Sequence, residues 1–234
     1  MADELKRDDS NIPPLLKTGE GDHVYCESFK VLRARFEQEI IDQKRTVVGI
    51  TSAIAGEGKT LLSAELAYSL ARSGRKKILL VDLDLRKADL AKGMGIEQSP
   101  GFSEYLKGSA DPAAIRKNSN IPGLYTIPAG KNTESPAQML AGERIRTFFE
   151  RVRGLFDIVL LDLPPILPVA DTIAVRDVVD GFLLVYRAGF TPYPLFQQAV
   201  EELGVEHVIG VILNGVHQRR EGYYRKYYGN YYKK

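Results

Sequence analysis

A glycine-rich turn between an apolar stretch and a helical pattern places the strongest constraint on how this chain folds. Residues 45–50 are typical of a buried strand, residues 51–60 read Thr-Ser-Ala-Ile-Ala-Gly-Glu-Gly-Lys-Thr, and residues 61–73 predict a helix. A strand, a glycine-rich turn and a helix that begins near Gly-Lys-Thr form the P-loop arrangement, in which backbone N–H groups and the helix N-terminus bind phosphate. We therefore expect Lys59 to reach the β- and γ-phosphates of a nucleotide and the hydroxyl of Thr60 to bind Mg²⁺.

A turn that only caps a helix is the competing interpretation of this stretch. It accounts for Gly56 and Gly58 but not for the adjacent pair Lys59 and Thr60. The usual phosphate-binding pattern starts with glycine, where this sequence has Ala53. The strand–turn–helix context nevertheless favours nucleotide binding.

Five further apolar stretches predict strands, and helical patterns lie between them. The strands are expected at 78–81, 124–127, 156–162, 181–186 and 207–214, and further helices at 27–42, 100–107, 135–154 (in two pieces) and 195–203. Strands that alternate with helices predict an α/β fold, with one doubly wound, mainly parallel sheet and helices on both faces.

Composition and charge divide the chain into three parts. We expect a flexible N-terminal arm at 1–22, one P-loop domain at 23–217 and a disordered tyrosine-rich tail at 218–234. The net charge is +2, but the last 16 residues carry +5 and the remainder −3. No apolar run reaches the roughly 18 residues that cross a bilayer, because Asp162 and three prolines interrupt 158–169. We therefore expect no transmembrane segment.

Three aspartates stand at or just beyond the ends of predicted strands. Asp82 and Asp84 follow the strand at 78–81, and Asp162 ends the strand at 156–162. In open α/β sheets the carboxyl ends of the strands carry the ligand chemistry. Carboxylates are suitable there for holding Mg²⁺ and for orienting an attacking hydroxyl. A single aspartate would more simply be a helix cap or a solvated charge, but three beside a P-loop favour an active site.

The tail contains six of the chain's twelve tyrosines, in three adjacent pairs: Tyr223, Tyr224, Tyr227, Tyr228, Tyr231 and Tyr232. A basic aromatic segment could bind single-stranded nucleic acid or anionic lipid. Neither explains why every aromatic residue is tyrosine. Phosphorylation does, because only tyrosine offers a hydroxyl, and each phosphate adds about −1.5 to −2 charges. A nucleic-acid partner is not expected, because the basic patch is short and terminal.

Several of these motifs together resemble the bacterial tyrosine kinases, or BY-kinases, of capsule and exopolysaccharide loci. These are P-loop proteins related to the MinD/ParA ATPases. The resemblance covers nearly the whole chain from about Tyr25. It rests on the Walker A stretch 52–60, the Walker A′ stretch Leu-Leu-Val-Asp-Leu-Asp-Leu-Arg at 79–86, the Walker B stretch at 158–165, the segments 128–130 and 135–140, and Leu-Asn at 213–214. The extra early lysine usual in MinD/ParA proteins is absent.

The resemblance implies a non-specific protein-tyrosine kinase that uses ATP and Mg²⁺ and phosphorylates its own tyrosine cluster in trans. It implies catalytic roles for Lys59, Asp82 and Asp84, and metal binding by Thr60, Asp82 and Asp162. The residues implied in nucleotide binding are Ala55, Gly56, Glu57, Gly58, Lys59, Thr60 and Leu61, with Arg187 and Asn214 on the side of the base.

The resemblance also implies partners. The family's early helix carries Glu-x-x-Arg-x-x-Arg at the interface of a ring-like homo-oligomer. This chain has Glu27, Lys30 and Arg33, and Lys30 keeps the charge but loses the bidentate fork of arginine. A membrane adaptor, or polysaccharide co-polymerase, is the expected activator. The expected location is cytoplasmic, at the inner face of the plasma membrane through that partner.

Two alternatives remain beside an autokinase that regulates capsular or exopolysaccharide synthesis or export. The first is a MinD/ParA-like ATPase regulated by a partner or membrane, without kinase activity. The second is a degenerate nucleotide-binding adaptor. Six paired tyrosines argue against the first, and the intact set of Lys59, Thr60 and three aspartates argues against the second.

Overall fold

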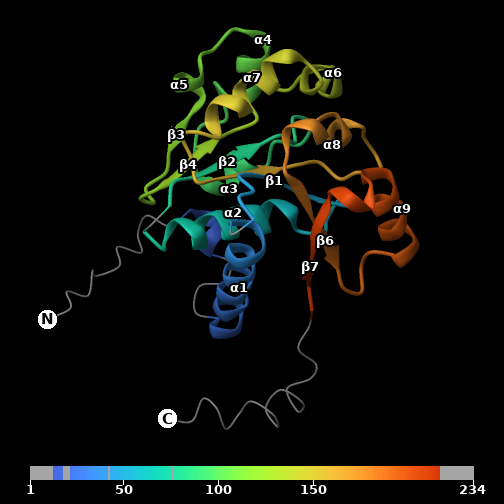
Figure 1. Cartoon of the computed structure of the whole chain (residues 1–234). Helices are drawn as coiled ribbons and strands as arrows, with labels where there is room; N and C mark the ends of the chain where they lie inside the picture. The colour runs from blue at the N-terminus through green and yellow to red at the C-terminus, as the bar shows by residue number, and fades with distance from the viewer. Residues whose placement is uncertain (1–12, 18–21, 42, 75, 217–234) are drawn as a thin grey trace, which may run out of the picture.

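A seven-stranded sheet forms the centre of the computed structural model, which describes residues 13–17, 22–41, 43–74 and 76–216 (Figure 1). Its strands are β1 (Val47–Ser52), β2 (Ile78–Asp82), β3 (Lys117–Asn118), β4 (Leu124–Ile127), β5 (Ile158–Asp162), β6 (Gly181–Arg187) and β7 (Val208–Asn214). Their order across the sheet is β3-β4-β2-β5-β1-β6-β7. Only β3 runs antiparallel to its neighbour. This confirms the predicted α/β fold with a mainly parallel sheet.

Helices cover both faces of the sheet. They are α1 (His23–Phe36), α2 (Lys59–Ala71), α3 (Leu90–Met94), α4 (Phe102–Lys107), α5 (Pro112–Ile115), α6 (Pro136–Leu140), α7 (Glu143–Val152), α8 (Asp171–Ala174) and α9 (Tyr193–Leu203), with single turns η2 (Pro14–Lys17), η3 (Glu37–Ile41), η4 (Arg176–Val178) and η5 (Val205–His207). None of the helices in this described part of the chain combines the length and the apolar character needed to span a bilayer.

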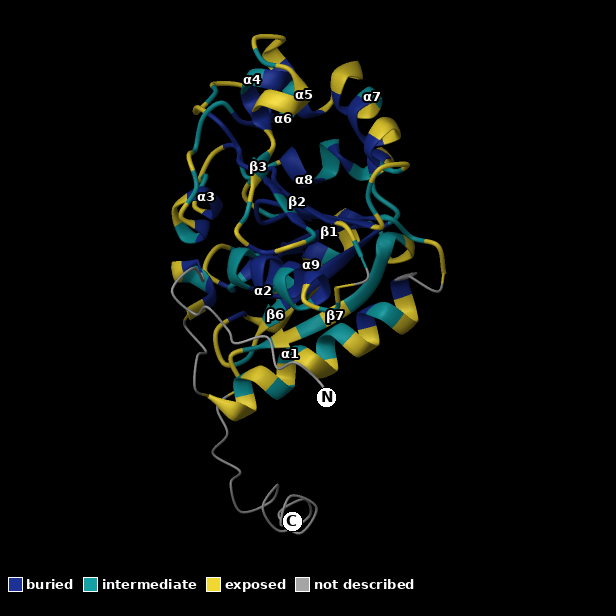
Figure 2. Ribbon diagram, turned by 90° about the vertical axis from the view of Figure 1, so that its left-hand side faces the viewer, coloured by how far each residue is buried: buried dark blue, intermediate teal, exposed yellow. Residues whose placement is uncertain are grey.

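The strands divide their side chains between two apolar layers, as the period of two requires. In β1, Val47 packs into the layer that includes residues of α4, α6, α7 and α9, while Val48 and Ile50 pack into the layer that includes residues of α2 and α3. Buried residues therefore fill both sides of the central strands (Figure 2). Strands that are apolar on both faces explain why the predicted strands read as continuous apolar runs.

Some boundaries differ from the sequence-based expectation. The first helix begins at His23 rather than at Glu27, because the carboxylate of Asp22 accepts the N–H groups of Val24 and Tyr25 and caps the helix. The helical pattern expected at 135–154 forms two helices, α6 and α7, as predicted. The short elements α3, α5, α8 and β3 were not predicted, since two to five residues carry too little periodicity.

The expected N-terminal arm includes the turn η2, where Leu16 is buried beside α2 and α3. Residues 14–17 of the expected arm therefore pack against the domain. Residues 1–12 and 18–21 lie outside the described residues, as do 217–234, which include the expected tail. The three-part division stays a prediction.

Candidate active site

The P-loop connects the carboxyl end of β1 to the first residue of α2. Gly56 has φ +87° and Gly58 has φ +93°, a left-handed conformation that side chains disfavour. A Cβ at Gly58 would also collide with the side-chain amide of Asn214. These two glycines are thus required by the backbone itself. Lys59 starts α2 and is largely buried, and its charge acts on the carboxyl group of Asp162.

Asp82 and Asp162 lie side by side at the ends of neighbouring strands. The parallel register of β2 and β5 pairs the two residues directly, and β5 also pairs Ile50 of β1 with Asp162. Both residues are buried, next to the end of β1 that leads into the P-loop. Asp84 follows two residues after β2 and is half-buried. The strand order β2-β5-β1 therefore brings the three predicted aspartates and the P-loop together.

Burial dominates the electrostatics of the two paired carboxyl groups. It raises the pKa of Asp162 to about 6, although Lys59 and a hydrogen bond from Thr60 favour the charged form. It also raises the pKa of Asp82 well above the ordinary value, and the neighbouring charges of Asp162 and Asp84 add to this. Because burial disfavours the charged form of both carboxyl groups, the two can be ionised at the same time only with a cation beside them.

Asp82 has one oxygen available for that cation. Its Oδ1 accepts the N–H of Asp84 at 3.0 Å, while its Oδ2 is buried with no hydrogen-bond partner in the described part of the chain. Asp162 Oδ1 accepts the hydroxyl of Ser63 at 3.2 Å. No three His, Cys, Asp or Glu side chains among the described residues form a metal-binding group by themselves. One or two carboxylates with a hydroxyl suit Mg²⁺, which takes its remaining ligands from water and nucleotide phosphates.

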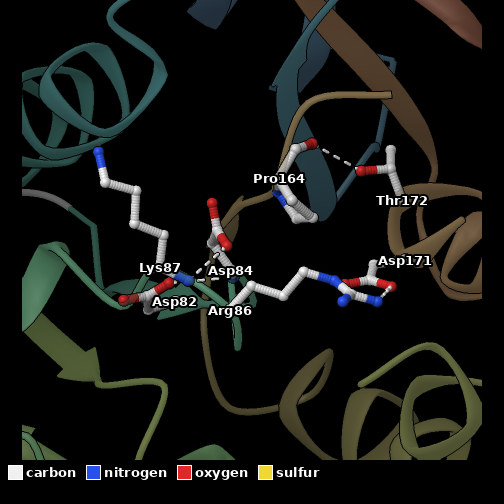
Figure 3. A network of polar contacts seen from close by, with 7 residues as sticks. All are labelled: Asp82, Asp84, Arg86, Lys87, Pro164, Asp171 and Thr172. Carbon is white, nitrogen blue, oxygen red and sulfur yellow. Dashed lines mark hydrogen bonds and ion pairs between the residues drawn. The ribbon is translucent and has the colours of Figure 1, made fainter. Parts of the chain in front are cut away.

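The loop after β2 is anchored by Arg86. Its Nε donates to Asp171 Oδ2 at 2.8 Å and its Nη2 donates to Oδ1 at 3.0 Å. Figure 3 shows the Arg86 side chain reaching across to Asp171, which is fully buried. The carbonyl of Pro164, after β5, accepts the hydroxyls of Thr51 and Thr172 at 2.8 Å each. These bonds tie the loop after β2 to α8, and the segment after β5 to both β1 and α8.

Arg187 and Asn214 reach the site from the ends of β6 and β7. Arg187 Nη1 donates to the carbonyl of Gly56 at 2.7 Å, and Asn214 Nδ2 donates to the carbonyl of Glu57 at 2.8 Å. Both side chains thus contact the backbone of the P-loop. Their predicted contact with the base stays a prediction.

The predicted interface residues lie apart from this site, on α1. Lys30 Nζ and Glu27 Oε1 are 2.6 Å apart, and both side chains are exposed. Arg33 instead turns toward α2, where its Nη1 donates to the carbonyl of Ser69 at 3.2 Å. The interface role expected of Arg33 stays a prediction. The predicted phosphoacceptor tyrosines, 223 to 232, lie outside the described residues.

Sequence reasoning gave no site role to Ser63, Asp171 or Thr191. The sequence did offer a signal for Ser63, because it lies one helical turn after Lys59 and so on the same side of α2. Asp171 lies beyond the Walker B stretch at 158–165 and carries no local signal for its pairing with Arg86, which is 85 residues away. Thr191 carries no local signal, since its partner in the P-loop is 134 residues away.

Comparison with known proteins gives consistent matches. A family model described as an AAA domain matches residues 45–185, more than half of the chain. Tyrosine-protein kinase CpsD of Streptococcus agalactiae is 32% identical over 213 residues, covering 89% of this chain and 90% of CpsD. Succinoglycan biosynthesis transport protein ExoP of Rhizobium meliloti is 33% identical over 223 residues, covering 89% of this chain but 28% of ExoP.

A solved structure gives a similar result. The kinase domain of Escherichia coli tyrosine kinase ETK superimposes with a TM-score of 0.83 at 28% identity, covering 92% of this chain and 85% of that domain. The chain thus spans most of CpsD and less than a third of ExoP.

Proposed function

The chain belongs to the bacterial tyrosine kinases, and on this premise we propose that it uses Mg²⁺-ATP to phosphorylate the tyrosine cluster 223–232 of another copy of itself. The observation that carries Mg²⁺-ATP binding in this proposal is the buried Oδ2 of Asp82, which has no hydrogen-bond partner among the described residues and lies beside Asp162 and the P-loop. A buried carboxylate oxygen without a donor is costly unless a ligand completes it. The named kinases among the relatives favour this function over the MinD/ParA-like ATPase.

The residues have distinct roles in this proposal. The backbone of 55–61 and the ammonium group of Lys59 bind the phosphates, as the open glycine turn and the helix N-terminus allow. Thr60, Asp82 and Asp162 hold Mg²⁺, which neutralises phosphate charge when bound. Asp84 is less buried than Asp82, so we assign it the orientation of the incoming tyrosine hydroxyl. Arg86 keeps this aspartate loop in place through Asp171.

We further propose a ring-like homo-oligomer and a membrane-bound activator in polysaccharide synthesis or export. Exposed Glu27 and Lys30 on α1 support the first, and the resemblance to CpsD and ExoP supports the second. Light scattering of Lys30→Arg tests the interface, because arginine restores a bidentate fork and should strengthen association. An unchanged mass for Lys30→Arg and for Lys30→Glu would remove this residue from the interface.

The kinase proposal is tested by mass spectrometry of phosphotyrosine on the purified full chain after incubation with Mg²⁺-ATP. Lys59→Met should reduce the phosphate incorporated by about 100-fold or more, because it removes a preorganised charge from the transferring phosphoryl group. Lys107→Met is the matched control, since Lys107 is exposed at the end of α4. It should behave as the wild type.

Protein concentration distinguishes phosphorylation between two copies of the chain from phosphorylation within one copy. Incorporation per chain that rises with concentration indicates transfer between copies, whereas a constant value contradicts the proposal of trans-phosphorylation. ATP hydrolysis without phosphotyrosine, both alone and with an activator's cytoplasmic segment, would support the ATPase alternative instead.

A further inference from the structure

Glu57 stands in the middle of the P-loop, yet its side chain is completely buried. A loop that binds phosphates gains nothing electrostatically from a carboxylate. No salt bridge neutralises Glu57 among the residues that the structure describes. Burying such a group is costly unless hydrogen bonds satisfy it. Its position therefore calls for a structural or functional reason.

Three donors from two segments satisfy the carboxylate. Oε2 accepts the N–H of Ile54 at 2.8 Å, which ties the beginning of the P-loop to its middle. Oε1 accepts the hydroxyl of Thr191 at 2.5 Å and the N–H of Arg187 at 3.3 Å. Thr191 is itself buried, at the start of the segment that leads into α9. The carboxylate thus joins the P-loop to the segment 187–191, which begins with the last residue of β6.

Two side chains hold the neighbouring carbonyl groups on this same side. Arg187 donates to the carbonyl of Gly56, and Asn214 donates to the carbonyl of Glu57. In a trans peptide, the C=O of one residue and the N–H of the next point in opposite directions. Fixing these two carbonyls therefore turns the N–H groups of Glu57 and Gly58 the other way, toward the side where phosphates bind.

We propose that Glu57 is a positioning residue, which latches the P-loop to Thr191 and Arg187 so that the loop's amides are aimed at the phosphates before a nucleotide arrives. We call Glu57, Thr191, Arg187 and Asn214 the latch. This inference rests on the proposed nucleotide binding. Its consequence is that residues 187–191, which contact Glu57 from 130 to 134 positions further along the chain, determine affinity for the phosphate chain.

Thr191→Val is the sharpest test, because valine has nearly the shape of threonine but no hydroxyl. The affinity of the full chain for Mg²⁺-ATP is measured by direct titration. Its affinity for inorganic tripolyphosphate is measured by competition against Mg²⁺-ATP. Loss of a hydrogen bond to a charged group predicts a loss of about 10- to 100-fold in affinity. Thr191→Ser keeps the donor and should restore most of the affinity. Glu57→Gln should weaken binding similarly, since its NH₂ group would face a donor.

Because tripolyphosphate has no base, it distinguishes an effect of the latch on phosphate binding from an effect on a contact with the base. If Thr191 acts by aiming the amides, ATP and tripolyphosphate lose affinity by the same factor. A loss confined to ATP would overturn the inference, as would equal affinities of Thr191→Val, Thr191→Ser and the wild type. If the wild type bound neither ligand while Lys59→Met behaved identically, the proposed nucleotide binding itself would fail. Thermal unfolding without nucleotide identifies variants that are folded.

Discussion

Glu65 offers a quantitative test of how α1 is attached to the domain. It lies in the middle of α2, is buried, and accepts the hydroxyl of Tyr25 in α1 at 3.0 Å. Burial raises its pKa from 4.5 to about 7, although the hydrogen bond from Tyr25 acts in the opposite direction. Because the folded pKa is the higher one, the carboxyl's stabilising contribution is complete below about pH 4.5 and is lost as pH rises through about 7.

Glu65→Gln removes this titration while keeping an oxygen that can accept from Tyr25. For a shift from 4.5 to about 7, linkage predicts that the wild type loses about 2 kcal/mol more than the variant between about pH 5.5 and about pH 8. Solvent screening at the helix–helix boundary lowers this expectation to about 1 kcal/mol. The variant should therefore gain stability relative to the wild type as pH rises.

Urea unfolding of both proteins at the two pH values measures this difference. All other titratable groups are common to both proteins, so their contributions cancel in the subtraction. Glu150→Gln is the control, because Glu150 is exposed on α7. Its difference from the wild type should not depend on pH. A pH-independent difference for Glu65→Gln would refute the reasoning, because it would mean that Glu65 is ionised in the folded chain.

Three further substitutions test the structure. Asp180→Asn should cost about 1–3 kcal/mol in urea unfolding, because the carboxylate accepts the N–H groups of Thr46 and Val47 at the start of β1 and a bond from Arg153. Despite burial these bonds lower the pKa of Asp180, so the difference should shrink only as pH falls below 3.8. Gly58→Ala should cost about 1–2 kcal/mol in thermal unfolding and abolish ATP binding measured by calorimetry, because of its positive φ and the contact with Asn214. Arg86→Lys should cost about 1–3 kcal/mol in urea unfolding, because lysine cannot form the bidentate pair with a buried carboxylate; a change below about 0.5 kcal/mol would show that the pair is not needed.

The sequence was sufficient to predict those features that depend on contiguous residues. The P-loop is one stretch whose backbone conformation follows from its glycines and from the strand and helix beside it. The aspartates at or just beyond the ends of β2 and β5 were predicted to meet the P-loop, because parallel strands end at the same edge of the sheet. The fold class followed similarly from the alternation of strands and helices. These inferences required only local periodicity and general rules of sheet topology.

The tertiary structure decided which separated side chains meet. Arg86 and Asp171 are 85 residues apart, Tyr25 and Glu65 are 40 apart, and Glu57 and Thr191 are 134 apart. Each pairing depends on which strands are neighbours and on how a helix lies against the sheet. Periodicity indicates that a residue is buried but not what it is buried against. The sequence therefore determined that this chain has a P-loop and three aspartates at or just beyond the ends of neighbouring strands, and packing determined what holds them in position.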